Sequence, residues 1–396
     1  MVKLLKTKNM ARWYICWGIL LLLGVVVGRV YADPPEPIVQ KVNGNLIGGG
    51  NVDGFRISPD SEWITYWADQ DTNNIFEVYS VSTHGGAPIK LNGALTPGKN
   101  VTNFEISPGS GRVIYLADQD IDEVFELYSV PIGGGTPVKL NVPLTLGKNV
   151  INFELMQGSG RVIYRADQDT DEVYELYSVP IGGGTPVKLN GVLVPGKNVE
   201  AFKISPDSSR VVYRADQDTD NGFELYTVPI GGGAAIKLNG LIVPGGDVYE
   251  FLISPNSDRV IYRADQNTND GLELYSVPIG GGTPIKLNGS IAPGGDVGST
   301  FQISLDSRWV IYPADQRAKD LYEIFSVPIT GGTPILLNSS LPPGGDVWDF
   351  LISPDSNRVV YQAEQRAKEL FEIFSVPIAG GTPVLLNSPL PPGGDV

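Results

Sequence analysis

Short stretches in which apolar and polar residues alternate recur along most of the chain. One unit contains FKISP (202–206), RVVYRA (210–215), FELYTV (223–228) and AAIKLN (234–239), which are rich in β-branched and aromatic residues. Alternation with a period of two predicts β-strands, and the Pro, Asp, Ser and Gly residues between the stretches predict tight turns. Each unit is therefore expected to form four antiparallel strands.

The unit occurs seven times at an almost constant spacing. An alanine at the end of the second strand marks every copy, and successive alanines are 49 residues apart except for one step of 50: Ala68, Ala117, Ala166, Ala215, Ala264, Ala314 and Ala363. A period of this length with four short strands is typical of a β-propeller, whereas solenoids use shorter units. The sequence predicts an all-β, seven-bladed β-propeller with four-stranded antiparallel blades.

The two ends of the repeat array leave its limits open. One period before the fourth strand of the first complete copy lies 39–43, which has the composition of a surplus fourth strand. The chain also continues past the seventh copy to 393–396, which resembles the entrance to another unit. We expect residues 39–396 to form seven blades, with 39–43 pairing with the edge of the last blade. The alternative is a shortened form of a longer, eight-bladed array.

The N-terminal segment has the features of an export signal. Four basic residues precede the uncharged run 13–28, and Val-Tyr-Ala at 30–32 places small or compact residues where a signal peptidase cleaves. We expect a signal peptide over 1–32, followed by a linker at 33–38. The alternative is an uncleaved membrane anchor. Either interpretation predicts an exported protein, located in the periplasm, on the cell surface or outside the cell.

The charge and the reactive residues limit the possible functions. The chain has 44 acidic and 29 basic residues, a formal net charge of −15, so it would repel nucleic acid. Its only histidine is His84, and its only cysteine is Cys16, within the predicted signal peptide. A histidine-based catalytic triad or a His-ligated metal centre is therefore not expected.

The repeat resembles a known family. The run F-x-I-S-P-D-S-x-R-V-V-Y, followed by E-L-Y-S-V-P and G-G-T-P-x-K-L, is similar to the TolB-like (WD40-like) propeller repeat, over nearly the whole mature chain. The resemblance implies a propeller fold, but not one function, because such repeats occur in periplasmic scaffolds and in the gating domains of peptidases. The α/β domain of TolB and the hydrolase domain of the peptidases have no counterpart in the repeats.

Acidic residues are concentrated in the turn between the second and third strands. Oxygen ligands at alternate positions can bind calcium, although the glycine and the bidentate glutamate of an EF-hand loop are missing here. The favoured interpretation is a solvated hairpin without a cofactor, and the alternative is a calcium site in the second to fourth copies. The candidate ligands are Asp118, Asp120, Asp122, Asp167, Asp169, Asp171, Asp216, Asp218 and Asp220.

A glutamate begins the third strand of every copy. Seven catalytic glutamates are implausible, so the repetition indicates a structural role. If Ala166 pairs with Tyr174, Arg165 faces Glu175, and a cross-strand ion pair is predicted there and at the matching positions of the next two copies. The seven glutamates are Glu77, Glu126, Glu175, Glu224, Glu273, Glu323 and Glu372.

Function is expected where the copies differ. The residue after the first-strand phenylalanine varies strongly and includes Arg56 and Lys203, and the segments that enter the first strands carry Tyr249 and Trp348. First strands line the centre of a propeller, and exposed aromatic residues are common contact residues. We select these four residues as candidates for binding a partner.

The sequence favours one function and leaves two alternatives. The first is a non-catalytic module at the cell envelope that binds or scaffolds a protein or peptide, without nucleic acid and with no membrane contact beyond an uncleaved N-terminal segment. The second is a polysaccharide hydrolase or lyase that uses carboxylates at the channel mouth. The third is a recently duplicated array with little selected function. The sequence does not indicate an oligomeric state.

Overall fold

The computed structural model describes residues 41–396 except 157, 194–195, 219–221, 268–270, 389 and 391–396. The predicted signal peptide or anchor, the linker and residues 39–40 lie outside this part. The chain divides into two compact units, Met1–Lys41 and Val42–Val396, and the second contains all described strands. In the described part, no helix is long and apolar enough to cross a membrane.

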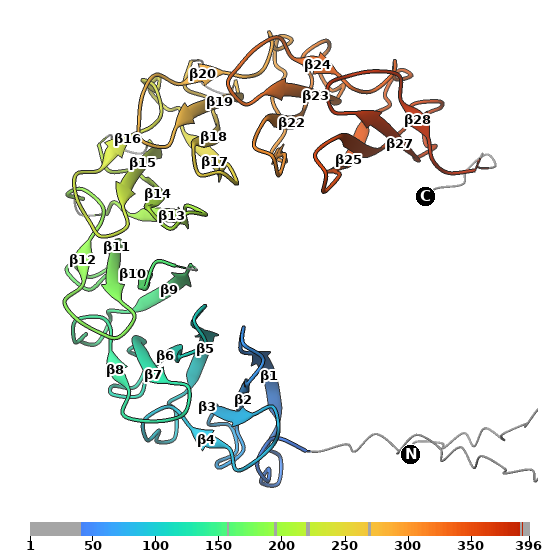
Figure 1. Cartoon of the computed structure of the whole chain (residues 1–396). Coiled ribbons are helices and arrows are strands. Elements are labelled where there is room, and N and C mark those ends of the chain that lie inside the picture. The colour runs from blue at the N-terminus through green and yellow to red at the C-terminus, as the bar shows by residue number, and fades with distance from the viewer. Residues whose placement is uncertain are drawn as a thin grey trace, which may run out of the picture. The chain divides into compact units, whose positions relative to one another are not determined.

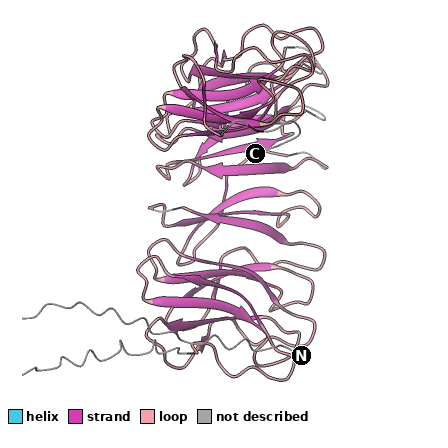
Figure 2. Ribbon diagram, turned by 90° about the vertical axis from the view of Figure 1, so that its right-hand side faces the viewer, coloured by secondary structure: helices cyan, strands magenta, loops and turns pink. Residues whose placement is uncertain are grey.

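Every regular element described is a strand (Figure 2), and the strands form seven sheets of four. We call the sheets blades 1 to 7 in chain order. The first strands are β1 (Val52–Ile57), β5 (Val101–Ile106), β9 (Val150–Leu155), β13 (Val199–Ile204), β17 (Val248–Ile253), β21 (Gln302–Ile303) and β25 (Val347–Ile352). The second strands are β2 (Trp63–Ala68), β6 (Arg112–Ala117), β10 (Arg161–Ala166), β14 (Arg210–Ala215), β18 (Arg259–Ala264), β22 (Trp309–Ala314) and β26 (Arg358–Ala363).

The third and fourth strands complete each blade in antiparallel order. The third strands are β3 (Glu77–Ser82), β7 (Glu126–Pro131), β11 (Glu175–Pro180), β15 (Glu224–Pro229), β19 (Glu273–Pro278), β23 (Glu323–Pro328) and β27 (Glu372–Pro377). The fourth strands are β4 (Ile89–Lys90), β8 (Val138–Lys139), β12 (Val187–Lys188), β16 (Ile236–Lys237), β20 (Ile285–Lys286), β24 (Ile335–Leu336) and β28 (Val384–Leu385).

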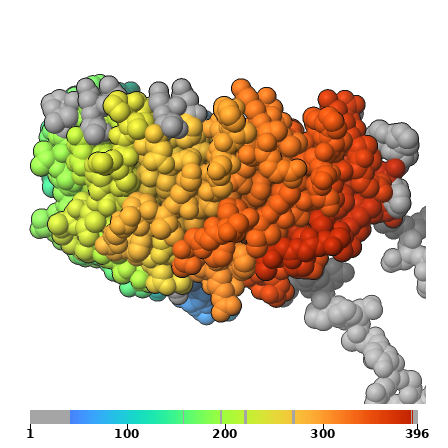
Figure 3. Space-filling model, turned by 90° about the horizontal axis from the view of Figure 1, so that it is seen from above, coloured from blue at the N-terminus to red at the C-terminus, as the bar shows by residue number. Residues whose placement is uncertain are grey.

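Successive blades lie beside one another, with the first strand of each on the inner side and the fourth on the outer side (Figure 1). We call these sides the inner edge and the outer edge. The space-filling view shows the later blades as adjoining bands of the surface (Figure 3). The predicted all-β, seven-bladed β-propeller is confirmed.

The hydrophobic core lies between the blades. Each of six clusters joins one face of a blade to the facing side of the next. Between blades 3 and 4, for example, Ile163, Leu176 and Leu189 pack against a group that includes Phe202 and Tyr213. Alternation along the strands places apolar residues on both faces, because both faces of an inner blade are covered.

The register of the second and third strands differs from the predicted one by one residue. Ala166 pairs with Glu175, and Arg165 pairs with Leu176. The prediction that Arg165 faces Glu175 was therefore wrong. A shift of one residue moves a side chain to the opposite face of the sheet. Arg165 instead donates hydrogen bonds to the backbone carbonyls of Val199 and Glu200 in the next blade.

Residues 41–43, the described end of the predicted surplus strand, form no strand. Val42 packs against the cluster of blade 1 that contains Tyr66 and Tyr79. The adjoining Gly44 donates its backbone N–H to the hydroxyl of Tyr66 over 3.2 Å.

Candidate functional site

The third-strand glutamates lie in a buried charge network at the outer edge. In blade 3, Glu175 accepts hydrogen bonds from Lys188 on β12 at 2.7 Å and from the hydroxyl of Tyr177 at 2.9 Å. Lys188 also pairs with Asp169 of the hairpin at 2.6 Å. Burial, and next the charge of Glu175, raises the pKa of Tyr177, which keeps its hydroxyl protonated as a donor. The same four residue types meet in blades 1, 2 and 4.

Blades 6 and 7 hold the same glutamate with different residues. In blade 7, Arg366 of the hairpin pairs with Glu372 at 2.6 Å, and in blade 6 Arg317 pairs with Glu323 at 3.1 Å. The fourth-strand lysine is replaced by leucine in both blades, and the third-strand tyrosine by phenylalanine. In these two blades the hairpin, and not the fourth strand, supplies the cation that pairs with the glutamate.

The nine calcium candidates have three different environments. The first aspartate of each hairpin is buried and accepts backbone N–H groups: Asp118 accepts from Asn100 at 2.6 Å and from Glu123 at 3.2 Å. Asp167 makes the matching bonds, and Asp216 accepts from Asn198 at 2.7 Å. The second aspartates, Asp120, Asp169 and Asp218, pair with fourth-strand lysines.

The third aspartates complete this set. Asp122 and Asp171 lie beside Gly98 and Gly147 of the loop that leads into the next blade, and Asp220 lies outside the described residues. Within the described part of the chain, no three acidic, histidine or cysteine side chains converge to hold a metal ion. The first aspartates are therefore engaged by backbone N–H groups and the second by lysines.

A groove runs along the inner edge from blade 4 to blade 7. Its larger hollow, about 480 Å³, is lined by Ala201, Lys203, Arg214, Tyr249, Glu250, Phe251, Leu252, Ser299, Thr300, Phe301 and Gln302. A second hollow of about 250 Å³ is lined by Gly298, Ser299, Thr300, Pro313, Tyr322, Val347, Trp348 and Phe350. Because Ser299 and Thr300 line both, we treat the two hollows as one site, the inner groove.

The single inserted residue of the array explains where this groove lies. In blade 5, β17 pairs with β18 from Val248 to Ile253 with one bulge. In blade 6, Val297 forms only an isolated bridge with Ala314, and pairing resumes at Gln302. Between these points Gly298 still donates to Pro313, but Ser299 and Thr300 leave the sheet and are exposed.

Gly298 and Pro313 fix the floor of the second hollow. Gly298 donates its N–H to the carbonyl of Pro313 at 2.8 Å, and a Cβ on Gly298 would lie 2.8 Å from the proline ring. Pro313 also replaces the arginine that blades 3 to 5 use to reach the next blade, such as Arg263, which donates to the carbonyl of Val297. Trp348 on the following blade is 74% exposed.

Arginine side chains orient the aromatic and acidic residues of the groove. Arg263 forms a two-point ion pair with Glu250, at 2.7 and 3.2 Å, and lies 5.6 Å from the ring centre of Tyr249. Arg214 donates to the backbone carbonyl of Tyr249 at 2.7 Å. Glu250 is the only acidic residue that lines the described groove, and its charge is matched by Arg263.

Lys203 contributes a positive charge to the groove. Its ammonium group lies 6.0 Å from the ring centre of Phe251, and no described acidic residue lies within ion-pair distance of it. Glu154 occupies the same position one blade earlier. Burial raises the pKa of Glu154, and the positive charge of Lys203 opposes this rise. The groove therefore combines two exposed aromatic residues, Tyr249 and Trp348, with a net positive charge.

Three of the four candidate contact residues come together in this groove. Lys203 and Tyr249 line the larger hollow and Trp348 lines the smaller one. Arg56 does not take part: it pairs with Glu105 of blade 2 at 2.8 Å and donates to the carbonyl of Phe104. The sequence did not single out Pro313. The only indication was that the three preceding copies have arginine at the matching position.

Of three similar solved structures, the first supports this fold. Dipeptidyl peptidase 4 of Porphyromonas gingivalis is 9% identical, with a TM-score of 0.56 over 82% of this chain and 51% of the peptidase. TolB from Agrobacterium tumefaciens is 16% identical over 60% of this chain and 80% of that protein, with a TM-score of 0.33. Oligogalacturonate lyase in complex with manganese is 12% identical over 81% and 87%, with a TM-score of 0.41.

The chain spans about half the length of the peptidase, whose similarity concerns the fold alone. No protein-family model and no curated protein matched the sequence. Seven four-stranded sheets and the likeness to the peptidase together define a β-propeller fold, as the repeat predicted.

Proposed function

We propose that the chain is an exported, non-catalytic β-propeller whose inner groove binds a protein or peptide segment at the cell envelope. The observation that supports this most is the inner groove itself, where Tyr249 and Trp348 stand on either side of the released backbone at Ser299 and Thr300. Exposed aromatic residues beside a hollow are typical anchors for a partner. Free backbone groups can pair with an extended chain.

The positive charge of the groove favours an acidic segment. Lys203 and Arg214 line the larger hollow, while Glu250 is neutralised by Arg263. The whole chain has a formal net charge of −15, so this positive region contrasts with the rest of the molecule. A carboxylate-bearing peptide with an apolar or aromatic residue would match both features.

The polysaccharide hydrolase or lyase is the alternative function. General acid and base catalysis of glycosidic cleavage uses two carboxylates on either side of the bond. The described groove offers one, Glu250, in a two-point ion pair with Arg263. The proposal of a binding module therefore has more support in the site.

The test is selection from a displayed peptide library on the full chain. A double variant, Tyr249→Ala with Trp348→Ala, is compared with a control that truncates two exposed apolar loop residues outside the groove, Val192→Ala with Leu241→Ala. Selected peptides should be acidic and should lose at least about tenfold in affinity for each groove substitution, and nothing for the control.

Two results would contradict the proposal. One is a set of peptides that bind the double variant as well as the unaltered chain. The other is turnover of an oligosaccharide panel that disappears on substitution of Glu250 by Gln, which would favour the hydrolase or lyase.

A further inference from the structure

Three successive blades carry an arginine at the same position of the second strand, and one of these arginines lines the inner groove. The three residues are Arg165 in blade 3, Arg214 in blade 4 and Arg263 in blade 5. Each donates Nη1 to a backbone carbonyl where the chain enters the next blade. The three guanidinium groups therefore have the same anchor, and they differ in the acidic residues around them.

In blade 5 the arginine pairs with the residue opposite it on the first strand. Glu250 lies directly opposite Arg263 in the pairing of β17 with β18. Its carboxylate accepts hydrogen bonds from Nε at 2.7 Å and from Nη2 at 3.2 Å. A two-point contact of this kind matches the planar fork of a guanidinium group and is stronger than a neutral hydrogen bond. Blade 5 thus shows where a carboxylate lies beside an arginine that is anchored in this way.

In blade 3 an acidic residue approaches the arginine from another position. Asn152 lies opposite Arg165, and the Nε atom of Arg165 has no acceptor among the described residues. Burial lowers the pKa of Arg165, and the negative charge of Glu200 at the entrance to blade 4 opposes this fall. Blades 3 and 5 therefore both bring a carboxylate near the arginine.

Blade 4 has no acidic residue at either position. Ala201 lies opposite Arg214, and Tyr249 occupies the position that Glu200 has one blade earlier. Among the described residues, no carboxylate pairs with Arg214, and its Nε atom is buried without an acceptor. A buried donor without an acceptor lowers stability, and a ligand that supplies the acceptor removes this cost.

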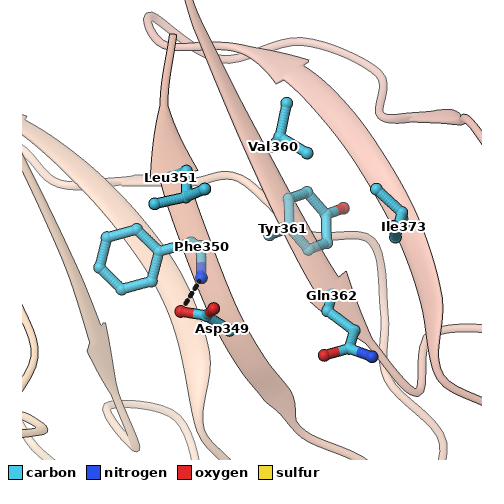
Figure 4. Close-up of a pocket in the computed structure, with 7 residues that line it drawn as sticks. All are labelled: Asp349, Phe350, Leu351, Val360, Tyr361, Gln362 and Ile373. Atoms are coloured by element: carbon cyan, nitrogen blue, oxygen red, sulfur yellow. Dashed lines mark hydrogen bonds between the residues drawn. The ribbon is translucent and has the colours of Figure 1, made fainter. Parts of the chain in front are cut away.

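Blade 7 has the opposite combination, an acidic residue without the arginine. Asp349 lies opposite Gln362 in the pairing of β25 with β26 (Figure 4). The carboxylate of Asp349 accepts the backbone N–H of Phe350 at 2.8 Å. The first-strand position therefore holds a carboxylate in blades 5 and 7, whereas blade 4 has the arginine and lacks the acid.

The space beside the arginine of blade 4 is open to a ligand. Ala201, Lys203 and Arg214 all line the larger hollow of the inner groove, which measures about 480 Å³. Because the alanine side chain ends at Cβ, it does not fill the place that a glutamate side chain takes in blade 5. The exposed Lys203 adds a second positive charge to the same hollow.

We infer that Arg214 determines the specificity of the groove: a carboxylate of the bound segment occupies the place left by Ala201 and forms a two-point contact with Arg214. The contact is the one that Glu250 forms with Arg263 inside the molecule. This inference rests on the proposed binding of a protein or peptide segment. The carboxylate belongs either to an acidic side chain of the segment or to its C-terminus, because both present the same two oxygens.

The test supplies the carboxylate from the chain itself. Ala201→Glu recreates in blade 4 the acidic residue of blade 5 and leaves Arg214 unaltered, and Ala201→Gln is a control of the same size without the charge. Peptides selected on the unaltered full chain are titrated into both variants by calorimetry, and circular dichroism confirms folding. Ala201→Glu should bind the peptides at least about tenfold more weakly than Ala201→Gln, because its own carboxylate occupies the arginine.

Changes in the peptide identify the source of the carboxylate. Each acidic side chain of a selected peptide is converted in turn to its amide, and a further peptide has an amidated C-terminus. One of these changes should weaken binding to the unaltered chain at least about tenfold and should have little effect on Ala201→Glu, because both changes remove the same contact. That change shows whether a side chain or the C-terminus is recognised.

A conservative variant separates the two-point contact from attraction by charge alone. Arg214→Lys keeps the positive charge and loses the planar fork, so it should also bind the intact peptide at least about tenfold more weakly than the unaltered chain. Unchanged affinity for Arg214→Lys would contradict the inference.

Other results distinguish the inference from the function on which it rests. If selected peptides bind Ala201→Glu as tightly as Ala201→Gln, or if none of their carboxylates matters, the inference is wrong and the binding function stands. If no peptide is selected, or if the groove instead binds an oligosaccharide of uronic acids, the proposed function is wrong and this inference falls with it.

Discussion

Blades 1 to 5 and blades 6 and 7 bury the same glutamate at the outer edge with different partners. In the first group a fourth-strand lysine and a third-strand tyrosine donate to it, as Lys188 and Tyr177 do to Glu175. In the second group both donors are absent, and a hairpin arginine such as Arg366 takes their place. Three positions on three different segments have changed together.

This difference explains the acidic hairpins. An aspartate such as Asp169 stands beside the fourth-strand lysine and adds a second negative charge to it. Where leucine replaces the lysine, an aspartate would lie near the buried glutamate without a cation, so arginine is found instead. In blades 1 to 4 the second-position acid thus accompanies the fourth-strand lysine, and these four acids need no bound metal to balance them. Blade 5 keeps the lysine but has Asn267 at this position.

The largest effect is expected from removing the buried glutamate. Glu175→Ala leaves Lys188 and the hydroxyl of Tyr177 without their acceptor, and we expect a loss of roughly 2–3 kcal/mol in the free energy of unfolding. Denaturant unfolding measures the loss, with Glu172→Ala in the exposed hairpin as control. A loss no greater than that of the control would mean that the network does not stabilise the blade.

A substitution set in blade 7 tests whether the two arrangements are interchangeable. Arg366→Asp alone places a second acid beside Glu372 and should cost about 2 kcal/mol. Adding Leu385→Lys and Phe374→Tyr recreates the set of the first blades and should recover most of this loss. The coupling between the substitutions is measured in a mutant cycle. Strictly additive losses would show that the three positions are independent.

A smaller effect is expected in the dependence of stability on pH. Burial raises the pKa of Glu273, but hydrogen bonds from Lys286, Tyr275 and Asn267 outweigh burial and bring its pKa below 4.5. The contribution of Glu273 to the free energy of unfolding is therefore present above the pKa that it has in the unfolded chain. It is lost as pH falls through the pKa that it has in the folded chain. Burial raises the pKa of Glu323, and Arg317 opposes the rise without overcoming it.

The contribution of Glu323 consequently has the opposite sign. This contribution to the free energy of unfolding is present below the pKa of Glu323 in the unfolded chain, and it is lost as pH rises through its pKa in the folded chain. Between about pH 3 and 7, Glu273→Gln should flatten the loss of stability on acidification, whereas Glu323→Gln should gain stability relative to the unaltered chain as pH rises. Denaturant unfolding at several pH values checks this contrast, and two parallel profiles would contradict it.

The smallest effect is expected from calcium. A chain treated with chelator and then titrated with calcium should show no change in melting temperature beyond that seen with magnesium, because the first aspartates of these hairpins accept backbone N–H groups and the second pair with lysines. A ligand that binds only the native state raises the melting temperature. A saturable rise with calcium would restore the metal site that the aspartate spacing suggested.

The sequence predicted the fold because the information is local and repeated. The alanine period, the strand alternation and the turn residues recur in all seven copies, so one ambiguous copy does not matter. The register error arose because either Arg165 or Ala166 could have faced Glu175. The lysine that pairs with Glu175 lies on another strand, 13 residues later, where no local pattern indicates it.

The groove could be predicted in part. Variation among the copies identified Tyr249, Trp348 and Lys203, but the same criterion selected Arg56, whose ion pair with Glu105 lies between blades 1 and 2. The role of Pro313 depends on a missing arginine and on an insertion in the facing strand. The sequence shows the proline and the insertion separately, and only the pairing of the two strands shows that they lie opposite each other.

We propose that the outer charge network belongs to the framework of the blades and that the inner groove binds the partner. Hydrogen–deuterium exchange of the full chain, with and without a peptide from the library selection, tests this most directly. We expect slower exchange in β17, at 297–303 and in β25, with no change in the hairpins at 118–123 and 167–172. Protection confined to those hairpins, with the groove unaffected, would contradict it.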